Sequence, residues 1–150
     1  MPQSLAKNII HLIYSTKNRE PSLSAKIRPE IFAYQAAIFR KCDSPAAVIG
    51  GEADHVHALF LLSRKSALSG VVEEVKRGSS KWIKTQGSDF ADFYWQSGYG
   101  AFSVSPSQVE QARRYIEGQS EHHRTVSYQD EFRAFLREYG IEYDEQYVWD

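Results

Sequence analysis

The chain has 150 residues and a mass of 17.2 kDa, the length of one ordinary domain. A hydrophobic fraction of 42% can close one core, and nine glycines and five prolines are too few for a fibrous or disordered chain. The net charge of −1 is uneven, because residues 1–128 carry 16 basic and 12 acidic side chains while residues 129–150 carry 2 and 7. A basic body with an acidic tail fits a nucleic-acid-binding protein only weakly.

The sequence gives no sign of a membrane segment or of a disulfide framework. No apolar run approaches the roughly 18 residues that cross a bilayer, and the first residues lack the pattern of a signal peptide. The single cysteine, Cys42, excludes an internal disulfide and a multi-cysteine zinc site, and we interpret it as a small packed residue. We therefore expect a single domain over residues 1–150, cytoplasmic and without a membrane partner.

Extended and helical patterns alternate in the first half of the chain. Residues 8–14 are apolar and β-branched, which predicts a buried strand, and residues 24–42 carry apolar side chains at helical spacing. Residues 46–51 and 55–62 are short apolar runs. The glycine-rich turn between them, residues 50–54, predicts a hairpin.

A second long helix and further strand material follow the hairpin. Apolar residues at helical spacing predict a helix over residues 68–83, where Gly78 costs about 1 kcal/mol and leaves one helix or two possible. Residues 94–95 and 99–104 have the composition of strands.

Two helices and a tail complete the chain. We expect helices over residues 107–121 and 128–139, the second ended by Gly140, and an irregular acidic tail over residues 141–150. The order is β-α-β-β-α-β followed by helices. It predicts an α+β fold with a ferredoxin-like antiparallel sheet, helices packed on it, and a C-terminal helix that carries candidate catalytic residues.

Two histidines lie on the second strand of the predicted hairpin. Successive side chains of a strand point to opposite faces, so His55 and His57 point one way and Val56 the other. Two imidazoles on one face can donate nitrogen ligands to a divalent metal. The pair therefore predicts a metal site, with hydrogen bonding at a strand edge as the alternative.

A tyrosine and a glutamine lie on the helix that follows Pro106. Tyr115 and Gln119 are four residues apart and share a helix face. Gln119 offers a carbonyl oxygen to a metal. Tyr115 offers a phenol, a poor nucleophile until a cation or a base activates it. The alternative is a tyrosine packed on the sheet and a solvated glutamine.

These motifs together resemble the single-tyrosine HUH transposases, the small enzymes of insertion-sequence-200-like elements and their REP-associated relatives. The likeness continues through further blocks that stand in the family's order. They are residues 54–57, 95–96, 98–105, 115–116, 119–123, 143–145 and 148–150. Nearly the whole chain is covered, which makes the resemblance far more specific than either short motif.

The resemblance implies a role for each motif residue. His55, His57 and Gln119 would hold Mg²⁺ or Mn²⁺. Tyr115 would attack a phosphodiester of single-stranded DNA, which forms a 5′-phosphotyrosine and frees a 3′-hydroxyl. A second 3′-hydroxyl would reverse the reaction and join a new strand. The resemblance also implies hairpin recognition at element ends and a homodimer with shared active sites.

Residues near these motifs need separate interpretations. Asparagine is common in the family where Gly118 stands, and we interpret the glycine either as a source of helix mobility or as tolerated drift. His122 and His123 are adjacent, so we expect them on different sides of the helix, as phosphate or partner contacts. We expect His11, on the first strand, to be a core histidine, with a position facing the same site as the alternative.

Basic residues on two predicted helices are the candidate DNA contacts. They are Lys76, Arg77, Lys81 and Lys84 on one helix, and Arg113 and Arg114 beside the tyrosine. Charged helix faces are usually just solvated, but six cations close to a phosphodiester-cutting site predict salt-dependent DNA binding. Trp82, Trp95 and Tyr99 are candidates for stacking on unpaired bases, with core packing as the alternative.

Three other functions are compatible with parts of this pattern. A domesticated copy that binds structured single-stranded DNA without transposing keeps every residue named above. A metal-binding protein with no nucleic-acid role predicts no preference for hairpin DNA and no salt dependence. A replication initiator or relaxase of the broader HUH class would need a larger scaffold.

Overall fold

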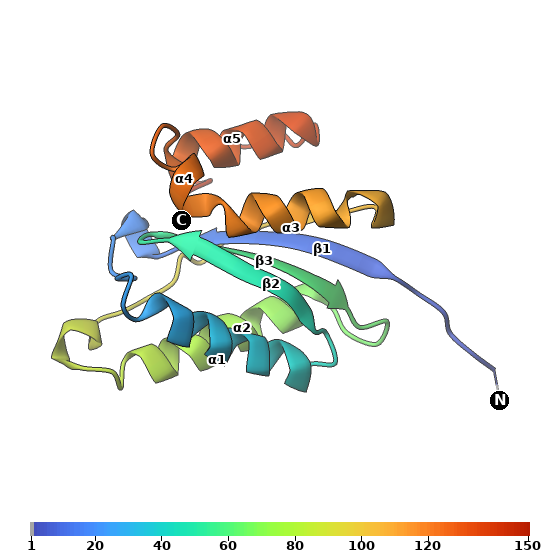
Figure 1. The fold of residues 1–150 in the computed structure, drawn as a ribbon, viewed down its shortest axis with the longest axis horizontal. Coiled ribbons are helices and arrows are strands. Elements are labelled where there is room, and N and C mark those ends of the chain that lie inside the picture. Colours follow the sequence, from blue (N-terminus) through green and yellow to red (C-terminus); the bar gives the residue numbers. More distant parts are fainter. Residues whose placement is uncertain (1) are drawn as a thin grey trace.

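A four-stranded antiparallel sheet forms the centre of the fold, with helices on both of its faces (Figure 1). The structure is a computed structural model that describes residues 2–150. Its strands are β1 (Asn8–Ser15), β2 (Ala46–Glu52), β3 (His55–Leu62) and β4 (Gly100–Ser103). Its helices are α1 (Arg28–Lys41), α2 (Leu68–Ile83), α3 (Val109–Glu117), α4 (Gln119–His122) and α5 (Tyr128–Glu138), with 3-10 turns at Lys17–Arg19, Ser88–Phe90 and Pro106–Gln108.

The strand order β2-β3-β1-β4 confirms the ferredoxin-like arrangement expected from the sequence. All neighbouring strands are antiparallel, and β1 pairs with β3 along its whole length. Residues directly opposite one another on paired strands point to the same face, so Ser15 and Ile13 share a face with His55 and His57. The register therefore fixes which side chains of β1 surround the two histidines.

One face of the sheet is covered by α1 and α2, and the main hydrophobic core lies there (Figure 1). The sheet contributes alternate residues of β1 and β3 to this core: Leu12, Tyr14, Val56, Ala58 and Phe60. Helix α2 is continuous through Gly78. A Cβ atom at that position would lie 2.7 Å from Cδ1 of Ile38 on α1. The two helices thus approach closely at the glycine, and Cys42 packs half-buried against the same core.

The opposite face of the sheet is covered by α3, α4 and α5 (Figure 1). Its apolar residues form two smaller clusters, one around Ile13 and Phe132 and the other around Ile9, Leu59 and Ile116. The histidines of β3 lie on this face. Its centre is therefore polar, whereas the centre of the other face is apolar.

Two glycines of the outer strands allow α3 and α5 to approach the sheet. A Cβ atom at Gly50 of β2 would lie 2.5 Å from the carbonyl oxygen of Ile116 on α3. A Cβ atom at Gly100 of β4 would lie 2.6 Å from the ring of Phe132 on α5. Each helix therefore rests on one edge of the sheet at a position where no side chain fits.

The C-terminal helices differ in detail from the expectation. The helix expected over residues 107–121 is divided at Gly118 into α3 and α4. The next helix, α5, begins after Ser127, whose hydroxyl accepts a hydrogen bond of 3.1 Å from the Asp130 backbone N–H. Between residues 2 and 150, no helix is both long and apolar enough to span a bilayer.

Candidate active site

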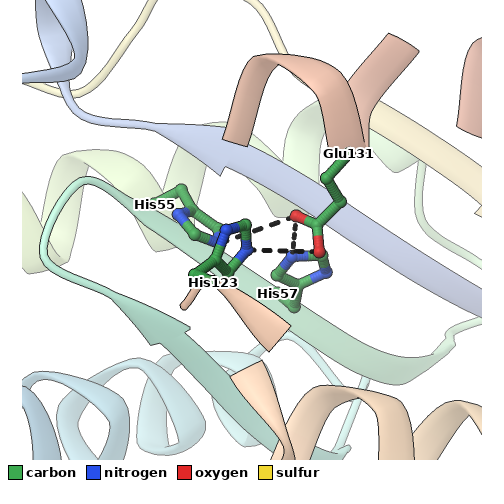
Figure 2. Close-up of side chains that lie close together, drawn as sticks. All are labelled: His55, His57, His123 and Glu131. Atoms are coloured by element: carbon green, nitrogen blue, oxygen red, sulfur yellow. Dashed lines mark hydrogen bonds and ion pairs between the residues drawn. The ribbon is translucent and has the colours of Figure 1, made fainter. Parts of the chain in front are cut away.

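Two buried imidazoles of β3 point toward the C-terminal helices. Nε2 of His55 lies 2.8 Å from Oε1 of Gln119 on α4, and Nε2 of His57 lies 2.9 Å from Oε1 of Glu131 on α5. His55 and His57 have no exposed surface. The strand alternation inferred from the sequence therefore places both rings where a metal could bind, and Figure 2 shows them facing the carboxylate of Glu131.

The outer nitrogen of each ring has a fixed partner. Nδ1 of His55 lies 2.7 Å from Oδ1 of Asp54, and Nδ1 of His57 lies 2.8 Å from Nε2 of His11. Such contacts orient imidazole ligands and direct the other nitrogen toward the metal. His11 is buried, as expected. It also contacts His57 and orients that ring.

Burial also keeps two of these rings neutral. Burial lowers the pKa of His57 to about 4, although the charge of Glu131 acts in the opposite direction. Burial and the neighbouring His57 lower the pKa of His11 to about 3. A neutral imidazole offers a lone pair, which is the form that binds a metal.

Glu131 stands at the centre of the cluster, and the sequence interpretation missed it. Its carboxylate accepts hydrogen bonds from Nε2 of Gln119 at 3.0 Å and from the hydroxyl of Tyr115. Burial alone would raise the pKa of Glu131, but hydrogen bonds from His123 and His57 hold that pKa well below its ordinary value. A signal was present in the sequence: Glu131 lies in the apolar stripe of α5 with Tyr128, Phe132 and Leu136.

Tyr115 reaches the cluster from α3. Its hydroxyl contacts Glu131 and lies 3.3 Å from Nε2 of His122. Burial, followed by the negative charge of Glu131, raises the pKa of this phenol well above its ordinary value. The side chain is half-buried and, with His11, lines a cavity of about 550 Å³ between α3, α5 and β4, so the hydroxyl is not sealed in hydrocarbon.

The break at Gly118 changes the directions of the residues after it. Oε1 of Gln119 lies 2.9 Å from Nε2 of His123, and Nε2 atoms of His122 and His123 lie 3.2 and 3.3 Å from Oε2 of Glu131. The expectation that these two histidines diverge is therefore wrong. It assumed one continuous helix, whereas α4 is a single turn that ends at His122.

The donor groups fit a divalent cation. Ligand atoms of His55, His57, His123 and Glu131 all lie within 4.8 Å of one another. The two nitrogens of His55 face Oδ1 of Asp54 and Oε1 of Gln119. With a cation at Nε2, that nitrogen and the Gln119 oxygen would both be ligands, and Asp54 would hold the ring through Nδ1. Imidazole and oxygen donors together suit Mn²⁺ better than Mg²⁺, which prefers oxygen alone.

The six candidate DNA contacts do not gather around this cluster. Lys76, Arg77, Lys81 and Lys84 lie on or just after α2, on the sheet face opposite the histidines (Figure 1). The expectation that these four cations lie close to the site is wrong, because the sequence did not indicate which face α2 covers. Only the two arginines of α3, Arg113 and Arg114, share the layer of Tyr115.

Several residues of the α2 layer already have internal partners. The ammonium of Lys76 donates hydrogen bonds to the carbonyl oxygens of Gln96 and Gly98 at 2.9 and 2.6 Å, and burial lowers its pKa to about 8. Trp82 stacks on Tyr34, and Trp95 is buried in the core. Core packing, the alternative to base stacking, is therefore confirmed for Trp95, whereas Trp82 and Tyr99 are partly buried at the edge of that core.

Comparisons with known proteins agree with the fold and the motifs. The family model described as "Transposase IS200 like" matches residues 4–119, which include the two histidines of β3, the tyrosine and the glutamine. A search of curated proteins found no match.

Two solved structures share the fold. One is a protein of Deinococcus radiodurans R1 described as a candidate transposase, with a TM-score of 0.62 and 20% identity over 79% of this chain and 98% of that chain. The other is a REP-associated tyrosine transposase bound to a REP hairpin, with a TM-score of 0.62 and 13% identity over 84% of this chain and 74% of that one. Since the family match covers well over half of the chain, the protein belongs to the family of IS200-like transposases, enzymes that cut and transfer DNA.

Proposed function

We propose that this protein cuts and rejoins single-stranded DNA through a covalent phosphotyrosine at Tyr115. The observation that carries the proposal is the convergence of a phenol from α3, an amide from α4 and two imidazoles from β3 on one buried carboxylate. Tyr115, Gln119 and His57 each contact Glu131, and His55 contacts Gln119. Nucleophile and proposed metal ligands thus belong to one hydrogen-bonded cluster, as activation of a weak nucleophile requires.

The proposed metal ligands are His55, His57 and Gln119. When bound, the metal would polarise the scissile phosphate and stabilise the charge that develops on it. Asp54 and His11 orient the two rings, because each forms a hydrogen bond with an Nδ1 atom that points away from the cluster. We propose Mn²⁺ as the preferred ion, because the donors are mainly nitrogen.

Tyr115 forms the new bond and Glu131 orients its hydroxyl. The phenolic oxygen attacks phosphorus, the bond from phosphorus to the 3′ oxygen breaks, and that oxygen takes a proton from solvent to become a free 3′-hydroxyl. The phenolic proton passes to solvent, while the Glu131 oxygen that accepts its hydrogen bond orients the phenol for attack. Attack by a second 3′-hydroxyl on the phosphotyrosine reverses these steps and joins a new strand.

The proposed DNA partner is a hairpin that flanks a single-stranded cleavage site. The related REP-associated tyrosine transposase was solved with a REP hairpin, which supports the choice. Arg113 and Arg114 stand beside Tyr115 and are proposed to contact the phosphates next to the cut. For Lys81 and Lys84 to contact the same DNA, the strand would have to pass around the edge of the sheet.

We further propose a homodimer, which the family resemblance implies. Within one chain, Tyr115 contacts the cluster through Glu131. Sedimentation of the protein at micromolar concentration tests the dimer: a monomer with full cleavage activity would exclude it.

Covalent trapping tests the proposed chemistry. Single strands with an imperfect hairpin, randomised flanking bases and a 3′ label are incubated with the protein and Mn²⁺. The label should remain on the protein, because Tyr115 holds the 5′ phosphate of the downstream fragment, whereas a 5′ label should leave on a shortened product. Tyr115→Phe should abolish the adduct. The matched variant Tyr147→Phe, on a side chain 61% exposed, should leave it unchanged.

Two results would contradict the proposal. An adduct on a residue other than Tyr115 would overturn the site assignment. Hairpin binding without any adduct or strand transfer would instead favour a domesticated DNA-binding protein.

A further inference from the structure

We propose that Glu131 is an additional ligand of the metal and thereby links metal binding to the position of Tyr115. The inference rests on the metal site of the proposed function. It concerns a residue of α5, which lies beyond the part of the chain that the family model matches, residues 4–119.

The two carboxylate oxygens of Glu131 face different partners. Oε1 faces β3, at 2.9 Å from Nε2 of His57 and 3.7 Å from Nε2 of His55. Oε2 faces α3 and α4 and contacts the Tyr115 hydroxyl. One oxygen is thus directed at the proposed metal ligands and the other at the nucleophile, as expected of a carboxylate that bridges the two.

The surroundings of Glu131 leave a place for a cation. The side chain is 1% exposed, and within residues 2–150 its four ion-pair contacts are all with histidines. A buried carboxylate is costly unless its charge is compensated. A divalent ion between the imidazoles and Oε1 would compensate that charge.

Packing holds the backbone of Glu131 in place. Tyr128, one turn earlier on α5, stacks on the ring of His55 with centroids 4.6 Å apart, and Phe132 contacts the sheet at Gly100. Helix α5 is therefore anchored on both sides of the carboxylate. An ion that attracts Oε1 would shift the carboxylate of Glu131 while the backbone of α5 stays in place. The Tyr115 hydroxyl, which is hydrogen-bonded to Oε2, would move with the carboxylate.

Calorimetric titration of the DNA-free protein with MnCl₂ tests the ligand assignment without any measurement of activity. Glu131→Gln keeps the size of the side chain and removes one anionic oxygen, and it should weaken Mn²⁺ binding by about tenfold or more. Glu131→Asp keeps the charge and should retain more affinity than Glu131→Gln. The matched control Glu121→Gln changes an α4 side chain that is 78% exposed and should bind Mn²⁺ like the parent protein.

Tyrosine ultraviolet absorption tests the link to Tyr115. Saturating Mn²⁺ should produce a difference spectrum in the parent protein that is absent in Tyr115→Phe and absent in Glu131→Gln at its own saturating Mn²⁺ concentration. Near-ultraviolet circular dichroism first establishes that each variant is folded. If Glu131→Gln unfolds, Glu131→Leu, which replaces the carboxylate with an apolar side chain in the buried face of α5, serves in the same titration, where affinity equal to the parent's would overturn the proposal.

The outcomes separate this inference from the proposed function. Unchanged Mn²⁺ affinity in folded Glu131→Gln overturns the ligand assignment, whether or not the protein cleaves DNA. A difference spectrum that persists in Glu131→Gln overturns the link to Tyr115. Weakened Mn²⁺ binding in a protein that forms no DNA adduct supports the inference while the strand-cleavage proposal fails.

Discussion

The two faces of the central sheet use the same strands for opposite purposes. On β3, Val56, Ala58 and Phe60 enter the continuous core beneath α1 and α2, whereas His55 and His57 face the polar cluster beneath α4 and α5. The apolar residues of the polar face are separated into two small clusters. Alternate residues of one strand thus serve the hydrophobic core and the candidate active site. We therefore expect truncation of core residues to reduce stability, and changes of pH or of polar side chains to act mainly on the site.

Lowering the pH should have the largest effect on the free energy of unfolding, and it should act through the buried histidines of the polar face. The pKa values of His11 and His57 are lowered to about 3 and 4 in the folded protein, so their stabilising contribution is complete above about pH 6.5 and is lost as the pH falls toward 4. The unfolded chain binds up to two more protons there, so the free energy of unfolding should fall by up to about 2.7 kcal/mol per pH unit.

Two neighbouring groups modify this pH dependence. Burial would lower the pKa of His123, but the hydrogen bond and charge of Glu131 outweigh burial and raise it. Protonation of His123 therefore opposes part of the loss of stability. The lowered pKa of Glu131 adds a further loss below about pH 4.5. Urea unfolding at a series of pH values measures the slope. His11→Gln should reduce it by about one proton per molecule, and an unchanged slope would contradict the assignment.

Truncation in the apolar face should come next in size. Phe60 is 1% exposed and packs on Phe39, so Phe60→Ala should lower the free energy of unfolding by about 3–5 kcal/mol. Its neighbour Leu61 points to the other face and is 39% exposed, and Leu61→Ala should cost less than about 1 kcal/mol. Urea unfolding at neutral pH compares them. Equal losses would show that the two faces do not differ as described.

A change behind the metal site should affect binding more than stability. Asp54→Asn weakens the acceptor that orients His55, and we expect Mn²⁺ affinity to fall by about 10- to 100-fold. Calorimetry measures the affinity and urea unfolding the stability. A protein that loses several kcal/mol of stability but keeps its Mn²⁺ affinity would reverse the proposed division between the faces.

Charge neutralisation should have the smallest effect and should distinguish the layers. With Arg113 and Arg114 both changed to glutamine, the salt dependence of single-strand binding should fall by about 1.4 in log–log slope, because each phosphate contact contributes about 0.7. The matched pair Lys81→Gln and Lys84→Gln, in the α2 layer, should leave the slope unchanged. Fluorescence anisotropy over a salt series measures both, and a reduced slope in the lysine pair would place DNA on both layers.

The sequence predicted those features that depend on local periodicity. The alternation of β3 placed His55 and His57 on one face, and the order of strands and helices gave the sheet topology. The layer of α2 could not be predicted, because amphipathicity shows which side of a helix is buried but not which sheet face it covers. His123 was excluded from the site because the break at Gly118 was not expected. Glu131 was missed because α5 brings it to the cluster only through tertiary packing.

Gly50 and Gly100 determine how closely α3 and α5 approach the sheet. They allow α3 and α5 to approach opposite edges of the sheet, and Gly50 lies directly opposite His57 in the strand pairing. A methyl group at either position would push one helix outward and lengthen the gap between amide, carboxylate and imidazole while every ligand stays the same. In the proposed metal site, the distances between the donor atoms would therefore depend on two small residues of the edge strands as well as on the ligands themselves.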